Sequence, residues 1–180
     1  PLSLEIANGE FLTLLGPSGS GKTTVLRLIG GFTAPSGGRI VFDGTSLVGM
    51  SAHRICRSGV GKTFQYVASF GDMTVLENAT VGGLARVGLA EARERAHAAI
   101  DRVGLAGREE VMAAELSLPE KARLELARAL ATRPRMMLLD EAMATLTPQE
   151  QREIVALVRE LRGEGITFLV IEHHMKTIMS

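Results

Sequence analysis

One short stretch near the start of the chain restricts its fold more than any other feature. Residues 16–23 follow the pattern Gly-x-x-x-x-Gly-Lys-Thr, in which the glycines let the backbone curl until several N–H groups face one anion. Lys22 supplies a positive charge for the outer phosphates of a nucleotide, and the Thr23 hydroxyl suits Mg²⁺. We therefore predict a phosphate-binding loop that consists of Gly16, Pro17, Ser18, Gly19, Ser20, Gly21, Lys22, Thr23 and Thr24.

The segments on both sides of this loop support the prediction. Residues 11–15 form a short apolar run that is typical of a buried strand. Residues 24–29 have a helical pattern that stops at two glycines. The alternative is a glycine-rich turn that matches the pattern by chance, and the order strand, loop, helix argues against it.

Length, charge and cysteine content narrow the class of protein. The 180 residues suit one domain, and 46% hydrophobic residues are enough for a core. Lysine plus arginine and aspartate plus glutamate balance at 20 each, so nothing favours nucleic acid as a partner. The single cysteine, Cys56, excludes an internal disulfide, and we expect an ordinary half-buried thiol rather than a reactive one.

Because the chain opens at Pro1 rather than Met, we expect a fragment of a longer protein.

Strand and helix patterns alternate along the chain and predict an α/β fold with a mostly parallel sheet covered on both faces. Residues 2–6 alternate apolar and polar side chains, which predicts a half-exposed strand in a small N-terminal antiparallel β part, joined by a hairpin turn at Asn8-Gly9 to the strand before the loop. Residues 39–42 predict another strand. Further strands are expected at 60–64, 136–139 and 166–171, and helices at 51–57, 91–103, 120–131 and 148–161.

The middle of the chain has a different character. From Met73 to Ala131 the strand patterns disappear, and alanine, arginine, glutamate and leucine dominate. We interpret this block as a helical subdomain, assigned to residues 66–131, within a single nucleotide-binding domain that spans residues 1–180.

Two carboxylates follow the apolar strand at 136–139. Asp140 and Glu141 are expected at the carboxyl edge of the sheet, where ligands of open α/β sheets bind. An aspartate there can hold Mg²⁺, and the glutamate can orient or deprotonate an attacking water. The alternative is a pair of acids that faces solvent. His173 follows the last strand and could contact a γ-phosphate at the same edge, although a single histidine is more often structural.

In order and approximate spacing, the phosphate loop, Gln65, the segments 116–131 and 137–141, and His173 resemble the ATP-binding subunit of ABC transporters. The resemblance covers nearly the whole chain and implies a P-loop NTPase core with an inserted helical subdomain. It further implies ATP and Mg²⁺ as cofactors, and an active form in which two subunits close head to tail over two ATP molecules.

The resemblance also implies roles for single residues. Gln65 resembles the Q-loop glutamine, a contact for Mg²⁺ and water, and Ser117 resembles the signature serine, which reaches the γ-phosphate of ATP on the opposite subunit. Glu141 resembles the catalytic glutamate and His173 the switch histidine. The metal would be organised by Thr23, Gln65 and Asp140.

Finer features look like the ATPase subunits of branched-chain amino acid importers: residues 63–65, 124–131, 141–150 and 170–175. That resemblance implies a homo- or heterodimer with a second ATP-binding subunit, a separate integral membrane permease, and a peripheral location at the cytoplasmic face of the inner (plasma) membrane. Two alternatives stay open: a nucleotide-binding regulatory subunit with little hydrolysis, and a soluble ABC ATPase that acts in DNA repair or on ribosomes.

The chain departs from the family signature Leu-Ser-Gly-Gly-Gln at three positions, where it has Leu118, Pro119 and Glu120. Pro119 has no N–H, so one phosphate donor is lost. The sequence Ser-x-x-Glu from Ser117 to Glu120 still predicts a capping box, and a proline is tolerated in the first helical turn. We therefore expect the helix to form but the grip across the dimer to weaken. Thr147 stands where the family has the D-loop aspartate.

Overall fold

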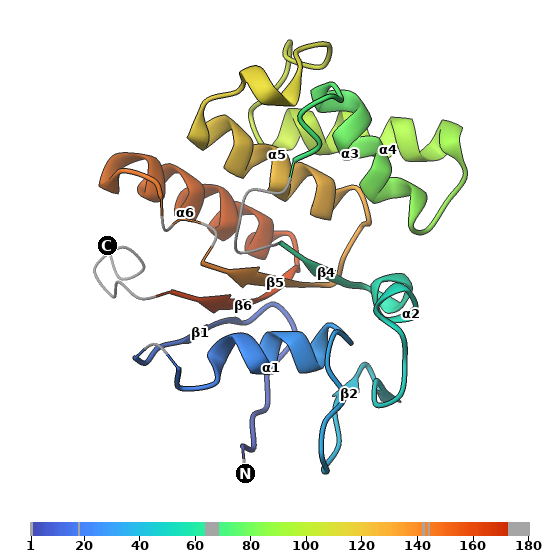
Figure 1. The fold of residues 1–180 in the computed structure, drawn as a ribbon, viewed down its shortest axis with the longest axis vertical. Helices are drawn as coiled ribbons and strands as arrows, with labels where there is room; N and C mark the ends of the chain where they lie inside the picture. The colour runs from blue at the N-terminus through green and yellow to red at the C-terminus, as the bar shows by residue number, and fades with distance from the viewer. Residues whose placement is uncertain (1, 18, 64–68, 142, 144, 173–180) are drawn as a thin grey trace.

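The protein is described by a computed structural model that covers residues 2–17, 19–63, 69–141, 143 and 145–172. At its centre lies a parallel four-stranded sheet with the order β1-β6-β5-β4 (Figure 1). Its strands are β1 (Phe11–Leu14), β4 (Val60–Lys62), β5 (Met136–Asp140) and β6 (Thr167–Ile171). The expected α/β architecture with a mostly parallel sheet is therefore confirmed.

The two faces of the sheet are buried under different helices. Side chains alternate along a strand, so Met137 and Phe168 lie in the larger core cluster with α6 (Pro148–Gly163). Leu138 and Leu169 lie in a second cluster with α1 (Lys22–Ile29). Figure 1 shows α1 and α6 on opposite sides of the sheet. Burial on both faces explains why these strands are continuous apolar runs rather than alternating ones.

The middle of the chain is helical, as the composition indicated. It contains α3 (Val75–Leu84), α4 (Leu89–Arg102) and α5 (Leu118–Leu130), preceded by the short 3₁₀ helix η1 (Ala113–Glu115). The three helices pack against one another above α6 in Figure 1. The sequence predicted α4 and α5 within a few residues.

Helix α3 is an element that the sequence patterns did not predict, because two glycines and a weak periodicity obscure it. Its start is nevertheless marked, since Thr74 and Glu77 form a capping box. One turn further, the buried Asn78 side chain accepts a hydrogen bond from the Phe70 N–H and donates to the carbonyl groups of Phe70, Met73 and Thr74. These bonds fix the segment that leads into α3.

The antiparallel part is smaller than expected. It consists of β2 (Val41–Phe42) and β3 (Thr45–Ser46), which pair with each other, followed by α2 (Ala52–Ser58). The expected strand at residues 2–6 is wrong: these residues have no regular secondary structure. A strand needs a partner, and the short β2–β3 ladder pairs only with itself among the described residues. In the part of the chain that the structure describes, no helix has the length and apolar composition to span a membrane.

Candidate active site

The strand register brings the predicted site residues to one edge of the sheet. Leu14 pairs with Ile171, and Ile171 pairs in turn with Asp140, so the ends of β1, β6 and β5 lie level. The phosphate loop leaves β1 at this level and Glu141 leaves β5. Parallel strands thus assemble a loop and an acidic pair that lie more than a hundred residues apart in sequence.

The loop itself needs glycine for its backbone conformation. Gly19 and Gly21 have φ angles of +79° and +89°, in the left-handed region that other residues rarely adopt. A side chain at either position would meet no heavy atom within 4 Å, so the requirement is conformational rather than steric. Gly21 is also the N-cap of α1, and the free N–H groups of a first helical turn attract anions.

Lys22 is buried and its ammonium group is held inside the loop. It donates hydrogen bonds to the carbonyl oxygens of Gly16 at 2.7 Å and Pro17 at 2.8 Å, and to the Ser20 hydroxyl at 3.2 Å. These contacts place a positive charge within the curled backbone, which is the arrangement that a phosphate-binding loop requires.

Thr23 and Asp140 meet across the same space. The Thr23 hydroxyl donates to one carboxylate oxygen of Asp140 at 3.3 Å, and Asp140 is only 2% exposed. A hydroxyl and a carboxylate are the hard oxygen ligands that Mg²⁺ prefers, and in P-loop NTPases they come from these two motifs. The residues present therefore fit a magnesium ion, which Thr23 and Asp140 would hold.

Lys62 was not predicted for the site, but it contacts the same carboxylate. It is the last residue of β4, and its ammonium lies 3.6 Å from the second carboxylate oxygen of Asp140. It also donates to the Thr63 carbonyl at 3.0 Å. Burial lowers the pKa of Lys62, while the charge of Asp140 acts in the opposite direction. No sequence signal marks this contact, because it depends on the pairing of β4 with β5.

Glu141 follows Asp140 with a left-handed backbone. Its φ angle is +51°, which is uncommon for a residue other than glycine and frequent at functional sites. Its backbone N–H still bonds to the Ile171 carbonyl at 3.1 Å. The chain therefore turns away from the sheet directly after Asp140, at the position predicted for the catalytic glutamate.

Ser117 lies at the N-cap of α5, and the expected capping box is present. Its backbone N–H and its hydroxyl both donate to one carboxylate oxygen of Glu120, at 2.9 and 2.7 Å, and Arg108 lies 3.1 Å from the other oxygen. The hydrogen bond from the Ser117 hydroxyl is the main cause that lowers the pKa of Glu120. Among the described residues, no hydrogen bond joins Ser117 to the phosphate loop.

Several predicted positions cannot be placed. Ser18, Gln65 and His173 lie outside the described residues, as does Ala142, which follows Glu141. The structure therefore brings together Lys22, Thr23, Asp140 and Glu141, and leaves the other predicted contacts as predictions.

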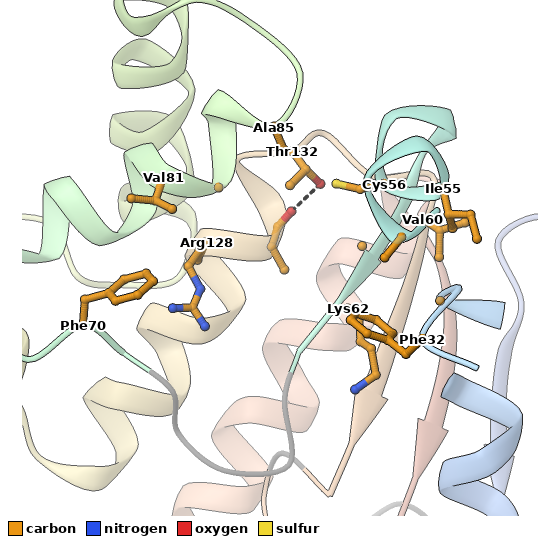
Figure 2. A pocket seen from close by; sticks show the side chains of 15 residues that line it. Phe32, Ile55, Cys56, Val60, Lys62, Phe70, Val81, Ala85, Arg128 and Thr132 are labelled. Atoms are coloured by element: carbon orange, nitrogen blue, oxygen red, sulfur yellow. Dashed lines mark hydrogen bonds between the residues drawn. The ribbon is translucent and has the colours of Figure 1, made fainter. Parts of the chain in front are cut away.

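A pocket of about 410 Å³ lies between the helical part and the sheet, and the sequence did not reveal it. Figure 2 shows Phe70, Val81 and Arg128 on its helical side. On the other side lie residues of α2 and β4, among them Cys56 and Lys62. Most of its wall is apolar. Lys62 lines the pocket and also contacts Asp140, so the pocket lies next to the candidate active site.

Comparisons with known proteins agree with this geometry. The sequence profile of a family described as ABC transporter matches residues 1–144. The chain is 38% identical to the high-affinity branched-chain amino acid transport ATP-binding protein LivG of Salmonella typhimurium, over 99% of this chain and 76% of that protein. It is 37% identical to the corresponding protein BraF of Pseudomonas aeruginosa, over 99% of this chain and 77% of that protein.

Solved structures show the same fold. The ADP conformation of MJ1267, an ATP-binding cassette of an ABC transporter, superposes with a TM-score of 0.90 at 29% identity and covers 99% of this chain and 76% of that one. The dimeric structure of MJ0796, a bacterial ABC transporter cassette, superposes with a TM-score of 0.85 at 28% identity and covers 98% of this chain and 80% of that one.

Proposed function

Because the chain belongs to the ABC transporter family, as an ATP-binding and ATP-hydrolysing cassette, we propose that it powers the import of branched-chain amino acids or chemically related solutes. The solute assignment is supported by the similarity to LivG and BraF, which are named as branched-chain amino acid transport proteins and match almost the entire chain. The single observation that carries the ATPase chemistry is the convergence of Thr23 and Asp140, 3.3 Å apart, beside the phosphate loop.

In this proposal, the residues at the edge of the sheet have the following roles in ATP hydrolysis. Lys22 and the loop N–H groups would bind the nucleotide phosphates, and Thr23 and Asp140 would hold Mg²⁺, whose positive charge would offset negative charge on the phosphates. Glu141 orients and deprotonates the attacking water. By resemblance, Gln65 would contact the metal and water, and His173 would contact the γ-phosphate.

We further propose that two cassettes act as a pair, in which Ser117 of one subunit faces the ATP of the other. The dimeric MJ0796 cassette supports a dimer for a chain of this fold. Glu120 places a carboxylate beside Ser117, so the contact across the pair would be weaker here than with the family signature. A pairing with a second, different ATP-binding subunit would relieve this weakness at one of the two sites.

The pocket between the sheet and the helical part is proposed as the docking site for a cytoplasmic helix of a separate permease. Its apolar wall suits the apolar face of a short helix, and Lys62, which contacts Asp140, is part of that wall. The cassette would then lie peripherally at the cytoplasmic face of the inner membrane.

Reconstitution tests the proposed function. The complete protein, assembled with its permease and second cassette in proteoliposomes, should accumulate leucine when ATP is supplied, and putrescine should serve as a solute that is not transported. Leucine uptake that is absent, while the complex still hydrolyses ATP, would contradict the solute assignment.

A variant of the pocket tests the docking site. Val81→Glu places a charge on the pocket wall and should prevent co-purification of the permease while ATP binding is retained. Leu89→Glu is the matched control, because Leu89 is 66% exposed and does not line the pocket. Equal co-purification of both variants would count against this site.

A further inference from the structure

Lys62 occupies an unusual position for a lysine. Its side chain is only 12% exposed, and its ammonium lies against a carboxylate that is itself 2% exposed. Lys62 pairs with Leu138, which lies two residues before Asp140 in β5. The long lysine side chain spans this distance along the edge of the sheet. The cost of burying a lysine is offset here by its contact with Asp140.

The two oxygens of Asp140 have different partners. One oxygen accepts from Thr23 and the other faces Lys62. The other nearby ammonium, that of Lys22, is bonded to the loop carbonyls of Gly16 and Pro17. Among the residues that the structure describes, Lys62 is the cation that forms an ion pair with the buried Asp140.

We propose that Lys62 is a positioning residue that takes the place of the metal at Asp140 and is displaced when Mg²⁺ arrives with nucleotide. This inference rests on the proposed function, since it assumes that Asp140 is a ligand of the metal. Two cations beside one carboxylate repel each other, so the Lys62 ammonium would move off Asp140 when the metal is bound.

In the position beside Asp140, the ammonium already has a further contact on the side of the pocket. The ring of Phe32 lies 5.9 Å from the Lys62 ammonium, within the range of a cation–π contact. Phe32 and Lys62 both line the pocket (Figure 2). An ammonium that leaves Asp140 can keep this aromatic contact, so the displacement would move positive charge away from Asp140 along the wall of the pocket and would report metal occupancy to the permease helix proposed to dock there.

Amine labelling of the unaltered protein tests the displacement directly. The complete protein is treated with an acetylating reagent in EDTA alone, in EDTA with AMP-PNP, and in Mg²⁺ with AMP-PNP, and acetylation of Lys62 is measured by peptide mass spectrometry. We expect slow labelling in both EDTA samples and at least about threefold faster labelling with Mg²⁺, because the buried ion pair is broken. Labelling that is unchanged or slower with Mg²⁺ would overturn the inference.

Binding measurements on variants provide an independent test. The ratio of the AMP-PNP dissociation constants in EDTA and in Mg²⁺ measures what the metal adds to binding. Lys62→Met should increase this ratio by about tenfold, because a charge that competes with the metal is removed, and Lys62→Arg should keep it near the unaltered value. An equal loss of affinity under both conditions would instead make Lys62 a phosphate contact.

The outcomes also separate this inference from the proposed function. If the unaltered protein does not bind AMP-PNP under either condition, the proposed function fails. If it binds AMP-PNP but the labelling and the ratio do not respond, only the role of Lys62 fails.

Discussion

At the start of α5, Glu120 has two roles that oppose each other. Its carboxylate caps the helix by accepting from the N–H and the hydroxyl of Ser117. Because these bonds lower its pKa, Glu120 is ionised at neutral pH, and its stabilising effect is fully present above the carboxyl pKa of the unfolded chain and is lost as the pH falls through the lower pKa of the folded protein. The same charge faces the nucleotide of the second cassette in the proposed dimer.

Glu120→Gln separates these roles. Glutamine also serves in a capping box, so the helix start should be kept, while the charge and the small stabilisation that depends on it are removed. We expect ATP turnover of the dimer to rise roughly fivefold, which corresponds to about 1 kcal/mol. Phosphate release measures this, with Glu94→Gln on the exposed face of α4 as the control. Equal turnover of both variants would show that the charge does not act on the nucleotide.

The single cysteine, Cys56, gives a second prediction for one residue. Burial raises the pKa of Cys56, and Arg86 offsets this in part. Since the thiolate is the reactive form, iodoacetamide should modify Cys56 at pH 7.5 at least about tenfold more slowly than in the denatured protein, and the rate should rise steeply with pH. Mass spectrometry follows the reaction. Equal rates in the folded and denatured protein would contradict the prediction that Cys56 is a partly buried thiol of low reactivity.

Among the elements, α3 is the one whose packing depends most on glycine. A methyl group at Gly82 would overlap the carbonyl oxygen of Arg128 in α5, and one at Gly83 would lie 2.9 Å from the Cα of Ala92 in α4. Both neighbours are backbone atoms, which cannot turn aside. The helical part is thus assembled by close approach of backbones.

Gly82→Ala should therefore reduce the free energy of unfolding by roughly 1–3 kcal/mol through overpacking. Gly163→Ala is the matched control, because Gly163 lies at the end of α6 with no heavy atom within 4 Å of an added methyl group. It should be neutral or slightly stabilising. Urea denaturation of both variants measures the difference, and similar values would refute the packing argument.

The sequence predicts those features of the structure that depend on local patterns, and not those that depend on tertiary packing. The strands β5 and β6 and the phosphate loop are local patterns, and each was predicted. α3 was missed because Gly82 and Gly83 lower its helical propensity while tertiary packing favours it. Lys62 and the pocket could not be found, since both arise when β4 lies beside β5 and the helical part closes over them.

In the complete fold, the candidate active site connects the edge of the sheet with the helical part. Thr23 and Asp140 meet at the edge of the sheet, Lys62 connects this edge to the pocket, and the helical part forms the opposite wall. An event at the phosphates can thus reach the proposed permease site through contacts already present.

The most direct test measures ATP binding and hydrolysis by the complete protein with Mg²⁺. We predict that calorimetry detects ATP binding to both the unaltered protein and Glu141→Gln, whereas phosphate release by the variant falls at least about 100-fold, because the base is lost and the phosphate contacts remain. Absence of ATP binding by the unaltered protein, or turnover that Glu141→Gln leaves unchanged, would contradict the account.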